Sequence, residues 1–254
     1  MPAMISRTLF PRLLRPALPL LAAFLSLACH STPKPPPTLA QQITSAHTFT
    51  SRDRRPTLQG LLLLQMESHP LLEARFVCET STNRIRLDLP DKTAIVFDGS
   101  QTWISPASSP LQHARSTHLA YPRLIALPFL LQSPNATLTD LGPQPLGSAT
   151  YAAARLTLGS PDDWYTLYTD PKTHRIEAIV YSTRLADPPA RAVTFYSYKT
   201  LGEAQLPTEW KFWKWHTTEG IYGPPLGTAR LLDLTSTGAK APLLARPPNS
   251  RPEQ

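Results

Sequence analysis

The sequence predicts a mainly β protein, an antiparallel sheet accompanied by a few short helices. The clearest signal is the alternation of apolar and polar residues over 83–89, which places Ile85, Leu87 and Leu89 on one face of a strand. A second signal is the Asp98-Gly99 pair between two short apolar runs, which is typical of a two-residue hairpin turn. Further apolar runs follow at the roughly ten-residue spacing of an antiparallel meander.

One helix and then a series of strands are expected along the chain. The helix covers residues 39–49 and carries Leu39, Ile43 and Ala46 on one side. The turn at 170–174 has a proline at its second position, and it places His174 in the left-handed conformation. Strands are expected at 58–66, 72–79, 83–89, 93–97, 102–104, 136–141, 151–158, 164–169, 175–183, 192–200, 207–216 and 228–235.

Residues 111–131 interrupt the strands with a dense run of leucines. Pro122 and Pro128 exclude one long helix, so we interpret the segment as one or two short apolar helices that begin near the prolines. Short helical pieces bury less surface than a continuous helix and open at lower cost. The segment is therefore predicted to be a lid over one side of the sheet.

Cys29 indicates where the protein resides. It ends an apolar run that begins at Ala17, and Arg7, Arg12 and Arg15 precede the run, which is the layout of a secretory signal. Residues 25–29 (LSLAC) resemble a bacterial lipobox, in which the cysteine is acylated and the peptide before it is removed. Acyl chains contribute about 0.8 kcal/mol per buried CH₂, so they make a stable anchor. Ordinary secretion is the alternative.

The residue that follows the cysteine bears on which membrane holds the protein. In well-studied enteric bacteria an aspartate there retains a lipoprotein at the inner membrane. His30 occupies that position and favours the outer membrane, facing the periplasm. We therefore expect a cell-envelope protein and leave the choice of membrane open.

Composition divides the chain into four parts. We expect a signal peptide at 1–28, a proline-rich tether at 29–38, one folded domain at 39–236 and a disordered proline-rich tail at 237–254. Three arginines leave with the signal, so the mature chain is less basic than the formal charge of +7. This charge argues against a nucleic-acid partner, which needs clustered basic residues.

Cys78 is the only other cysteine, so lipidation of Cys29 leaves no partner for a disulfide. In the strand at 72–79, Cys78 shares a face with Ala74 and Phe76. We therefore expect a buried, unpaired thiol that packs as a small apolar group.

Three segments resemble one family of uncharacterised bacterial secreted and lipid-anchored proteins. Residues 164–178 resemble its YxLYxDPxTGRLEA stretch, although His174 replaces the glycine, and residues 127–131 with 140–142 resemble its MPFxL…DLG. Residues 206–215 resemble its LPTxWxFYxW, and the likeness spans residues 39–235. The family is similar in architecture to the lipoprotein carriers LolA and LolB. The resemblance implies an antiparallel sheet curved into a half-barrel, closed by a helical lid over an apolar cavity for acyl chains.

The densest chemical feature is the strand at 209–216. Trp210 and Phe212 lie on one face, whereas Trp213 and Trp215 lie on the other, which suits a strand covered on both sides. The aromatics fit a structural core, a ligand wall or a platform for a sugar. His113 and His118 have no matching acidic residue, and Asp162-Asp163 and Glu67-Ser68-His69 fall in expected turns, so no metal site, cofactor or catalytic group is predicted.

The sequence therefore favours a lipid-anchored, non-enzymatic half-barrel that binds an apolar ligand, either an acyl chain or a lipidated protein. The alternative is a periplasmic interaction or sensor module whose groove is filled by side chains. The expected partners are the membrane, through the anchor, and such a ligand. The predicted ligand-binding residues are Leu119, Leu124, Leu127 and Phe129 in the lid and Val180, Phe195, Phe212 and Trp215 in the wall.

Overall fold

The computed structural model describes residues 35–47, 57–67, 69–80, 82, 84–112, 120–131, 133–158, 160–182, 191–202, 204–237 and 241–253. The chain divides into two compact units, Met1–Pro36 and Pro37–Gln254. The helices and strands of the described part lie in the second unit. The predicted signal with Cys29 and the segment with His113, His118 and Leu119 lie outside the described residues.

The second unit is built on one antiparallel sheet of thirteen strands, so the predicted fold class is confirmed. Its spatial order is β13-β5-β4-β3-β2-β1-β12-β11-β10-β9-β8-β7-β6. The strands are β1 (Thr57–Met66), β2 (Leu72–Glu79), β3 (Arg84–Asp88), β4 (Ala94–Phe97), β5 (Thr102–Ser105), β6 (Ala136–Leu146), β7 (Ala149–Leu158), β8 (Ser160–Thr169), β9 (Ile176–Ser182), β10 (Arg191–Leu201), β11 (Ala204–His216), β12 (Gly220–Thr237) and β13 (Arg251–Pro252).

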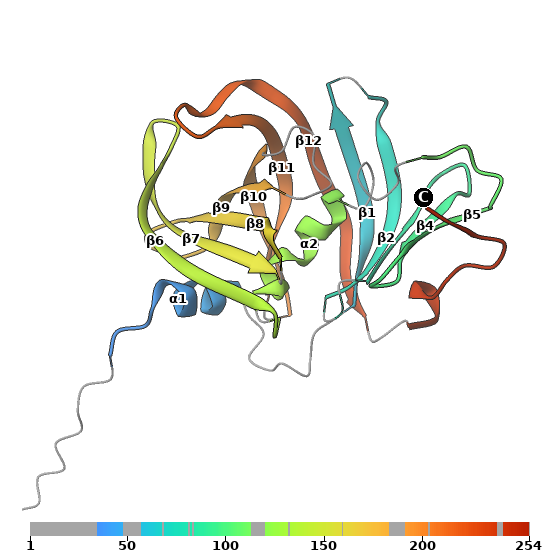
Figure 1. Cartoon of the computed structure of the whole chain (residues 1–254), viewed down its shortest axis with the longest axis horizontal. Coiled ribbons are helices and arrows are strands. Elements are labelled where there is room, and N and C mark those ends of the chain that lie inside the picture. The colour runs from blue at the N-terminus through green and yellow to red at the C-terminus, as the bar shows by residue number, and fades with distance from the viewer. Residues whose placement is uncertain are drawn as a thin grey trace, which may run out of the picture. The chain divides into compact units, whose positions relative to one another are not determined.

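Two meanders make up this sheet and meet at the pairing of β1 with β12. One runs from β1 outward to β5, and the other returns from the far edge at β6 to β12. The connection between them contains α2 (Ala120–Leu130), which crosses the sheet in the middle of Figure 1. This arrangement places α2 against β2 and against α1 (Leu39–His47), the other α-helix of the described part.

The meander from β6 to β12 is strongly curved. A Cβ atom on Gly220, at the start of β12, would lie 2.9 Å from the backbone nitrogen of Gly147 in the β6–β7 turn. These strands stand at separate places in the sheet order, and Figure 1 shows the β11–β12 hairpin arching toward the β6–β7 hairpin. The curvature gives this part of the sheet the character of a half-barrel.

Two predicted turns are present, although four residues, 98–101, connect β4 to β5 and not the expected two. Asp98 lies in the β4–β5 hairpin, where its carboxylate accepts hydrogen bonds from the amides of Ser100 and Gln101 and from the Trp103 indole. His174 has a φ of 57°, so it adopts the predicted left-handed conformation. Its amide donates to the carbonyl of Asp170 at 2.9 Å and closes the turn between β8 and β9.

The sheet buries apolar side chains on both faces. One face, the helix-side core, contains Ile43 of α1, the buried leucines of α2 and residues of both meanders such as Phe76 and Leu167. The other face carries a smaller group, the opposite-face cluster. Its members are Leu146, Ala153, Tyr168, Ala178, Val180 and Ala192, with Leu141, Tyr151, Trp164, Trp213, Trp215 and Ile221 packed around them.

Cys78 lies in the helix-side core with Ala74 and Phe76, as predicted. It is a free thiol and is fully buried. Burial raises the pKa of this thiol to about 12, and the charge of Glu79 acts in the same direction. The thiol is therefore protonated at neutral pH and unreactive.

In the described part of the predicted lid segment, Ala120–Leu130 forms one short helix, which contains both prolines. Pro122 lies in the first turn of α2, where a missing N–H costs little, and Pro128 lies two residues before its end. All seven residues from 124 to 130 are buried. A helix that is buried on every side is a core element, so moving α2 out of the sheet would expose much apolar surface.

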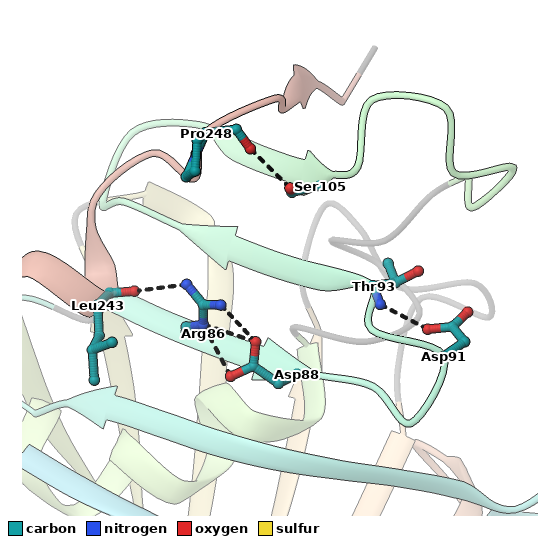
Figure 2. A network of polar contacts seen from close by, with 7 residues as sticks. All are labelled: Arg86, Asp88, Asp91, Thr93, Ser105, Leu243 and Pro248. Atoms are coloured by element: carbon teal, nitrogen blue, oxygen red, sulfur yellow. Dashed lines mark hydrogen bonds and ion pairs between the residues drawn. The ribbon is translucent and has the colours of Figure 1, made fainter.

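The C-terminal segment differs from the expected disordered tail. Residues Ala241–Leu244 form a short 3₁₀-helix, and Arg251–Pro252 pairs with β5 as β13. Figure 2 shows this segment held along β3 and β5. Arg86 forms an ion pair with Asp88 at 2.7 Å and donates to the Leu243 carbonyl at 3.4 Å.

Further hydrogen bonds fix the end of this segment. Ser105 donates to the Pro248 carbonyl at 3.0 Å, as Figure 2 shows. Arg251 donates to the carbonyls of Ser109 and Leu111, just before the connection to α2. Proline-rich composition suggested disorder, but prolines can lie along a sheet edge because they need no ladder hydrogen bond.

Candidate functional site

A groove lies between α1, the end of α2 and β6, on the face that carries the helices. Its volume is about 290 Å³, and it is open to solvent. Leu131 and Leu138 line it and also pack against the helix-side core. The other lining residues come from α1 and are Ala40, Gln41, Thr44 and Ser45. The groove is therefore an apolar depression at the rim of the helix-side core, and α1 forms one of its walls.

The start of α1 is fixed by its own sequence. The Thr38 hydroxyl accepts a hydrogen bond from the amide of Gln41 at 3.3 Å, and the Gln41 side chain accepts one from the amide of Thr38 at 2.9 Å. This reciprocal pair is a capping box, which satisfies two amides at the helix start that lack partners within the helix.

Two buried residues help to attach α1 to the rest of the unit, and Leu39 packs, half-buried, against the helix-side core. Ile43 and His47 are its buried residues, one turn apart on the same face. Ile43 belongs to the helix-side core. Burying one isoleucine side chain contributes about 1.5–3 kcal/mol, and the hydrogen bonds of His47 add to this attachment.

His47 connects α1 to two strands through both ring nitrogens. The amide of Ile176, at the start of β9, donates to Nε2 at 2.9 Å. Nδ1 lies 3.1 Å from the carbonyl oxygen of Gln205 on β11. Because Nε2 accepts, the ring is neutral, and Nδ1 carries the hydrogen that it donates to Gln205.

The surroundings of His47 keep it neutral. Burial lowers its pKa to about 4; the hydrogen bond to the Gln205 carbonyl opposes this effect, and the charge of Arg175 adds to it. The Tyr198 ring lies 5.9 Å from the imidazole, and Arg175 stacks over Tyr198 at 4.8 Å. Burial also raises the pKa of Tyr198, whose hydroxyl donates to the Ile176 carbonyl.

The predicted ligand-binding residues do not form one site. Val180 and Trp215 lie in the opposite-face cluster, on the other side of the sheet from the helices. Leu119 lies outside the described residues, and none of the other seven residues lines the groove. The other five lie together in the helix-side core and are Leu124, Leu127, Phe129, Phe195 and Phe212.

The groove residues were not predicted, because the apolar pattern of α1 indicated only which face of the helix packs against the sheet. The pattern of Leu39, Ile43 and Ala46 predicted the inner face of α1, but not a wall at its side. His47 carried no motif, since its two partners are distant strand residues, Ile176 and Gln205. Only the fold brings these groups together.

The aromatic strand β11 is covered on both sides, as predicted. Trp210 and Phe212 lie in the helix-side core, where their rings meet edge to face with centroids 6.4 Å apart. Trp213 and Trp215 pack against the opposite-face cluster, and the Trp213 indole donates to the Thr194 hydroxyl at 2.8 Å.

The described residues contain no group of three or more His, Cys, Asp or Glu side chains that could hold a metal ion. Glu67 and His69 are exposed at the end of β1, and the side chains of Asp162 and Asp163 are outside the described set. Within the described part, no helix has the length and apolar character needed to cross a membrane.

Comparison with known proteins identifies the fold. A LolA superfamily protein from Nitrosomonas europaea superposes with a TM-score of 0.50 at 8% sequence identity, over 82% of this chain and 96% of that one. A DUF1329 family protein from Desulfovibrio piger gives 0.50 at 10% identity, over 82% and 94%. No family model matches the sequence, and no curated protein matches it. The chain therefore has a LolA-like fold, and this likeness concerns the fold alone.

Proposed function

We propose that this chain is a membrane-anchored bacterial lipoprotein of the cell envelope that binds an apolar ligand on the helix face of its half-barrel. The ligand is an acyl chain or the lipidated end of another protein. Cys29 carries the anchor, and residues 29–38 form the tether to the folded domain. The protein acts by binding and not by catalysis.

The observation that carries this proposal is the groove beside α1. Leu131 and Leu138 are apolar residues that stay partly exposed in it while they pack against the helix-side core. An acyl chain laid there would remove more of their surface from water, at roughly 25 cal/mol per Å² of apolar area. The LolA-like fold supports the same choice of ligand class by analogy of architecture.

The position of α2 changes the role that we assign to its residues. Leu124, Leu127 and Phe129 are buried and do not line the groove, so we propose that they form the core beneath it and not a lid. Phe195 on β10 and Phe212 on β11 belong to the same core. Val180 and Trp215 face the other way, so we assign them to the structure of the sheet.

A second candidate function is an interaction or sensor module that binds no lipid. It is favoured by the burial of Leu124, Leu127, Phe129, Phe195 and Phe212, whose exposed fractions lie between 0% and 7%. These side chains fill the helix face at the positions where a wide cavity was expected. In this account a protein partner binds to the surface.

A fluorescence titration with cis-parinaric acid separates the two candidates. The full chain with Cys29→Ser lacks its own acyl groups and should bind the fatty acid with a Kd in the micromolar range, about −8 kcal/mol. Leu138→Asp places a charge in the groove and should weaken binding at least tenfold. Leu71→Asp changes an exposed leucine before β2 and serves as the matched control.

Each outcome of this titration supports or contradicts a named part of the proposal. Absence of saturable binding by the folded Cys29→Ser chain would overturn the proposal and favour the interaction module. Equal affinity of Leu138→Asp and Leu71→Asp would show that the ligand binds away from the groove. Circular dichroism of each variant checks that the sheet is intact.

A further inference from the structure

His47 is a buried titratable residue that the proposed binding site does not use. It lies in the last position of α1 and is 1% exposed. Its neutral ring is the acceptor for one backbone amide and the donor to one backbone carbonyl, on two strands that are distant in sequence. Such a residue supports the helix only while Nε2 carries no proton.

Protonation would reverse one of these two hydrogen bonds. An imidazolium has two N–H donors and no acceptor, so Nε2–H would face the N–H of Ile176 across the present 2.9 Å contact. The amide of Ile176 would then be buried without a partner, which is costly. The cation would also lie near the positive guanidinium of Arg175.

Among the residues that the structure describes, the charged groups around His47 offer it no compensating anion; Glu203, two residues before Gln205, lies outside them. His47 is the one ionisable side chain of α1, and β10 contributes Tyr198, which stays protonated. Arg175 precedes β9, and its positive charge acts to lower the pKa of the carboxyl groups of Glu177 and Asp170. The effects resolved on His47 itself come from burial, Gln205 and Arg175, without a contribution from either carboxylate.

Apart from this residue, α1 is attached by Ile43 and by the half-buried Leu39, which packs against the helix-side core. Ile43 and His47 are its buried residues, whereas α2 is buried throughout its last seven residues. Loss of the Ile176 hydrogen bond would leave Ile43 and Leu39 as the apolar contacts that hold α1. The helix that can leave the sheet at modest cost is therefore α1 and not α2.

We propose that α1 is an acid-released wall of the groove, and that His47 is the latch that holds it in place at neutral pH. Release of α1 removes four of the six residues that line the groove and exposes the adjoining rim of the helix-side core. The consequence for ligand binding rests on the proposed function; the latch itself does not. The low pKa of His47, about 4, sets the range in which the latch responds.

Hydrogen–deuterium exchange of the full chain with Cys29→Ser tests the latch directly. The readout is the protection of the peptide that contains residues 39–47, corrected for intrinsic exchange, at pH 7 and pH 4. In the unchanged His47 background, protection should fall on the order of a hundredfold, because the pKa differs by about 2.5 units between the latched and released states. The peptide of β2 should remain protected, which separates local release from acid unfolding.

Two variants at the same position make the test specific. His47→Gln keeps one N–H donor and one carbonyl acceptor but cannot be protonated, so α1 should stay protected at both pH values. His47→Phe keeps the ring volume but loses both hydrogen bonds, so α1 should be unprotected even at pH 7. Equal loss of protection in His47→Gln and in the His47 chain would overturn the proposal, as would joint loss by α1 and β2.

Lipid binding is measured in parallel with pyrene-labelled phosphatidylcholine, whose headgroup does not titrate between pH 4 and pH 7. Weaker binding at pH 4 by the His47 chain, but not by His47→Gln, is the expected result, because release of α1 removes four of the six groove-lining residues. If α1 is released and the lipid does not bind at either pH, the proposed function fails and the latch stands. If the lipid binds equally at both pH values and α1 stays protected, the latch fails and the proposed function stands.

Discussion

The amide of Ile176 donates a hydrogen bond to Nε2 of His47 at 2.9 Å, although the two residues are 129 positions apart in the sequence. The bond joins the end of α1 to the beginning of β9. It exists only with the neutral ring, so a proton competes directly with the Ile176 amide for the same lone pair. The position of α1 is thereby coupled to pH.

The stability of the protein should depend on pH through His47. Its pKa is about 4 in the folded chain and 6.5 when exposed, so the unfolded state binds the proton more tightly. Stability from this residue is therefore full above pH 6.5, falls as the pH drops toward 4, and is lost below that value. The total effect is about 3 kcal/mol.

Urea unfolding of the His47 chain and of His47→Gln at pH 7, 5.5 and 4 measures this effect. The difference between their free energies of unfolding should shift in favour of His47→Gln as the pH falls. Carboxylates titrate in both chains, so their contribution cancels in the comparison. Parallel pH profiles would contradict the assignment of His47 as a buried neutral hydrogen-bond acceptor.

The C-terminal segment should contribute measurably to stability. Arg251→Ala removes the two hydrogen bonds to the carbonyls of Ser109 and Leu111 and should cost about 2 kcal/mol. Arg246→Ala is the matched control, because Arg246 is exposed and stacks on Trp103 at 4.3 Å, a contact worth about 0.5–1 kcal/mol. Thermal unfolding measures both; a silent Arg251→Ala would support the disordered tail that the composition suggested.

Twelve of the thirteen strands of the described part were predicted from the sequence, because side chains that alternate between two faces leave a period of two in the residue pattern. The strand β13 was missed, and β12 begins at Gly220, eight residues before the expected start at 228. Residues 83–89 and the Asp98-Gly99 turn correspond to β3 and the β4–β5 hairpin. The free, buried Cys78 followed from the same alternation. The tail was misjudged, since its order depends on long-range partners such as Arg86 and Ser105, which no local pattern reveals.

The candidate site was less predictable than the fold. Val180 and Phe212 are both apolar residues in predicted strands, so the sequence does not show which face each one occupies. The sheet places them on opposite faces. The density of leucines in α2 suggested a lid, but the same density is what a fully buried helix requires. His47 is important because it forms hydrogen bonds with two backbone groups. The pattern of side chains in the sequence does not indicate such backbone partners.

Close packing at the junction of the two meanders should not tolerate a methyl group. A Cβ atom on Gly227 would lie 2.4 Å from the carbonyl oxygen of Gln65 on the paired strand β1. Because the obstacle is backbone, Gly227→Ala should cost about 3 kcal/mol. Gly202→Ala is the control: it has no atom within 4 Å and should cost about 1 kcal/mol for its positive φ. Urea unfolding that ranks Gly202→Ala as the more damaging change would contradict this packing.

Membrane attachment should depend on Cys29. Cys29→Ser removes the thiol that would be acylated and should move the protein from the membrane pellet to the soluble fraction after ultracentrifugation. Ser31→Ala, two residues later, should leave it in the pellet. Retention of Cys29→Ser in the membrane fraction would show that the anchor lies elsewhere.

The most direct test of apolar-ligand binding is native mass spectrometry of the full chain with Cys29→Ser, purified from a bacterial envelope without detergent and followed by lipid extraction. Bound acyl lipid should appear as a discrete mass addition to the folded chain, and Leu138→Asp should reduce its occupancy while Leu71→Asp should not. A folded chain that carries only its polypeptide mass, and yields no lipid on extraction even after incubation with envelope lipids, would contradict the account.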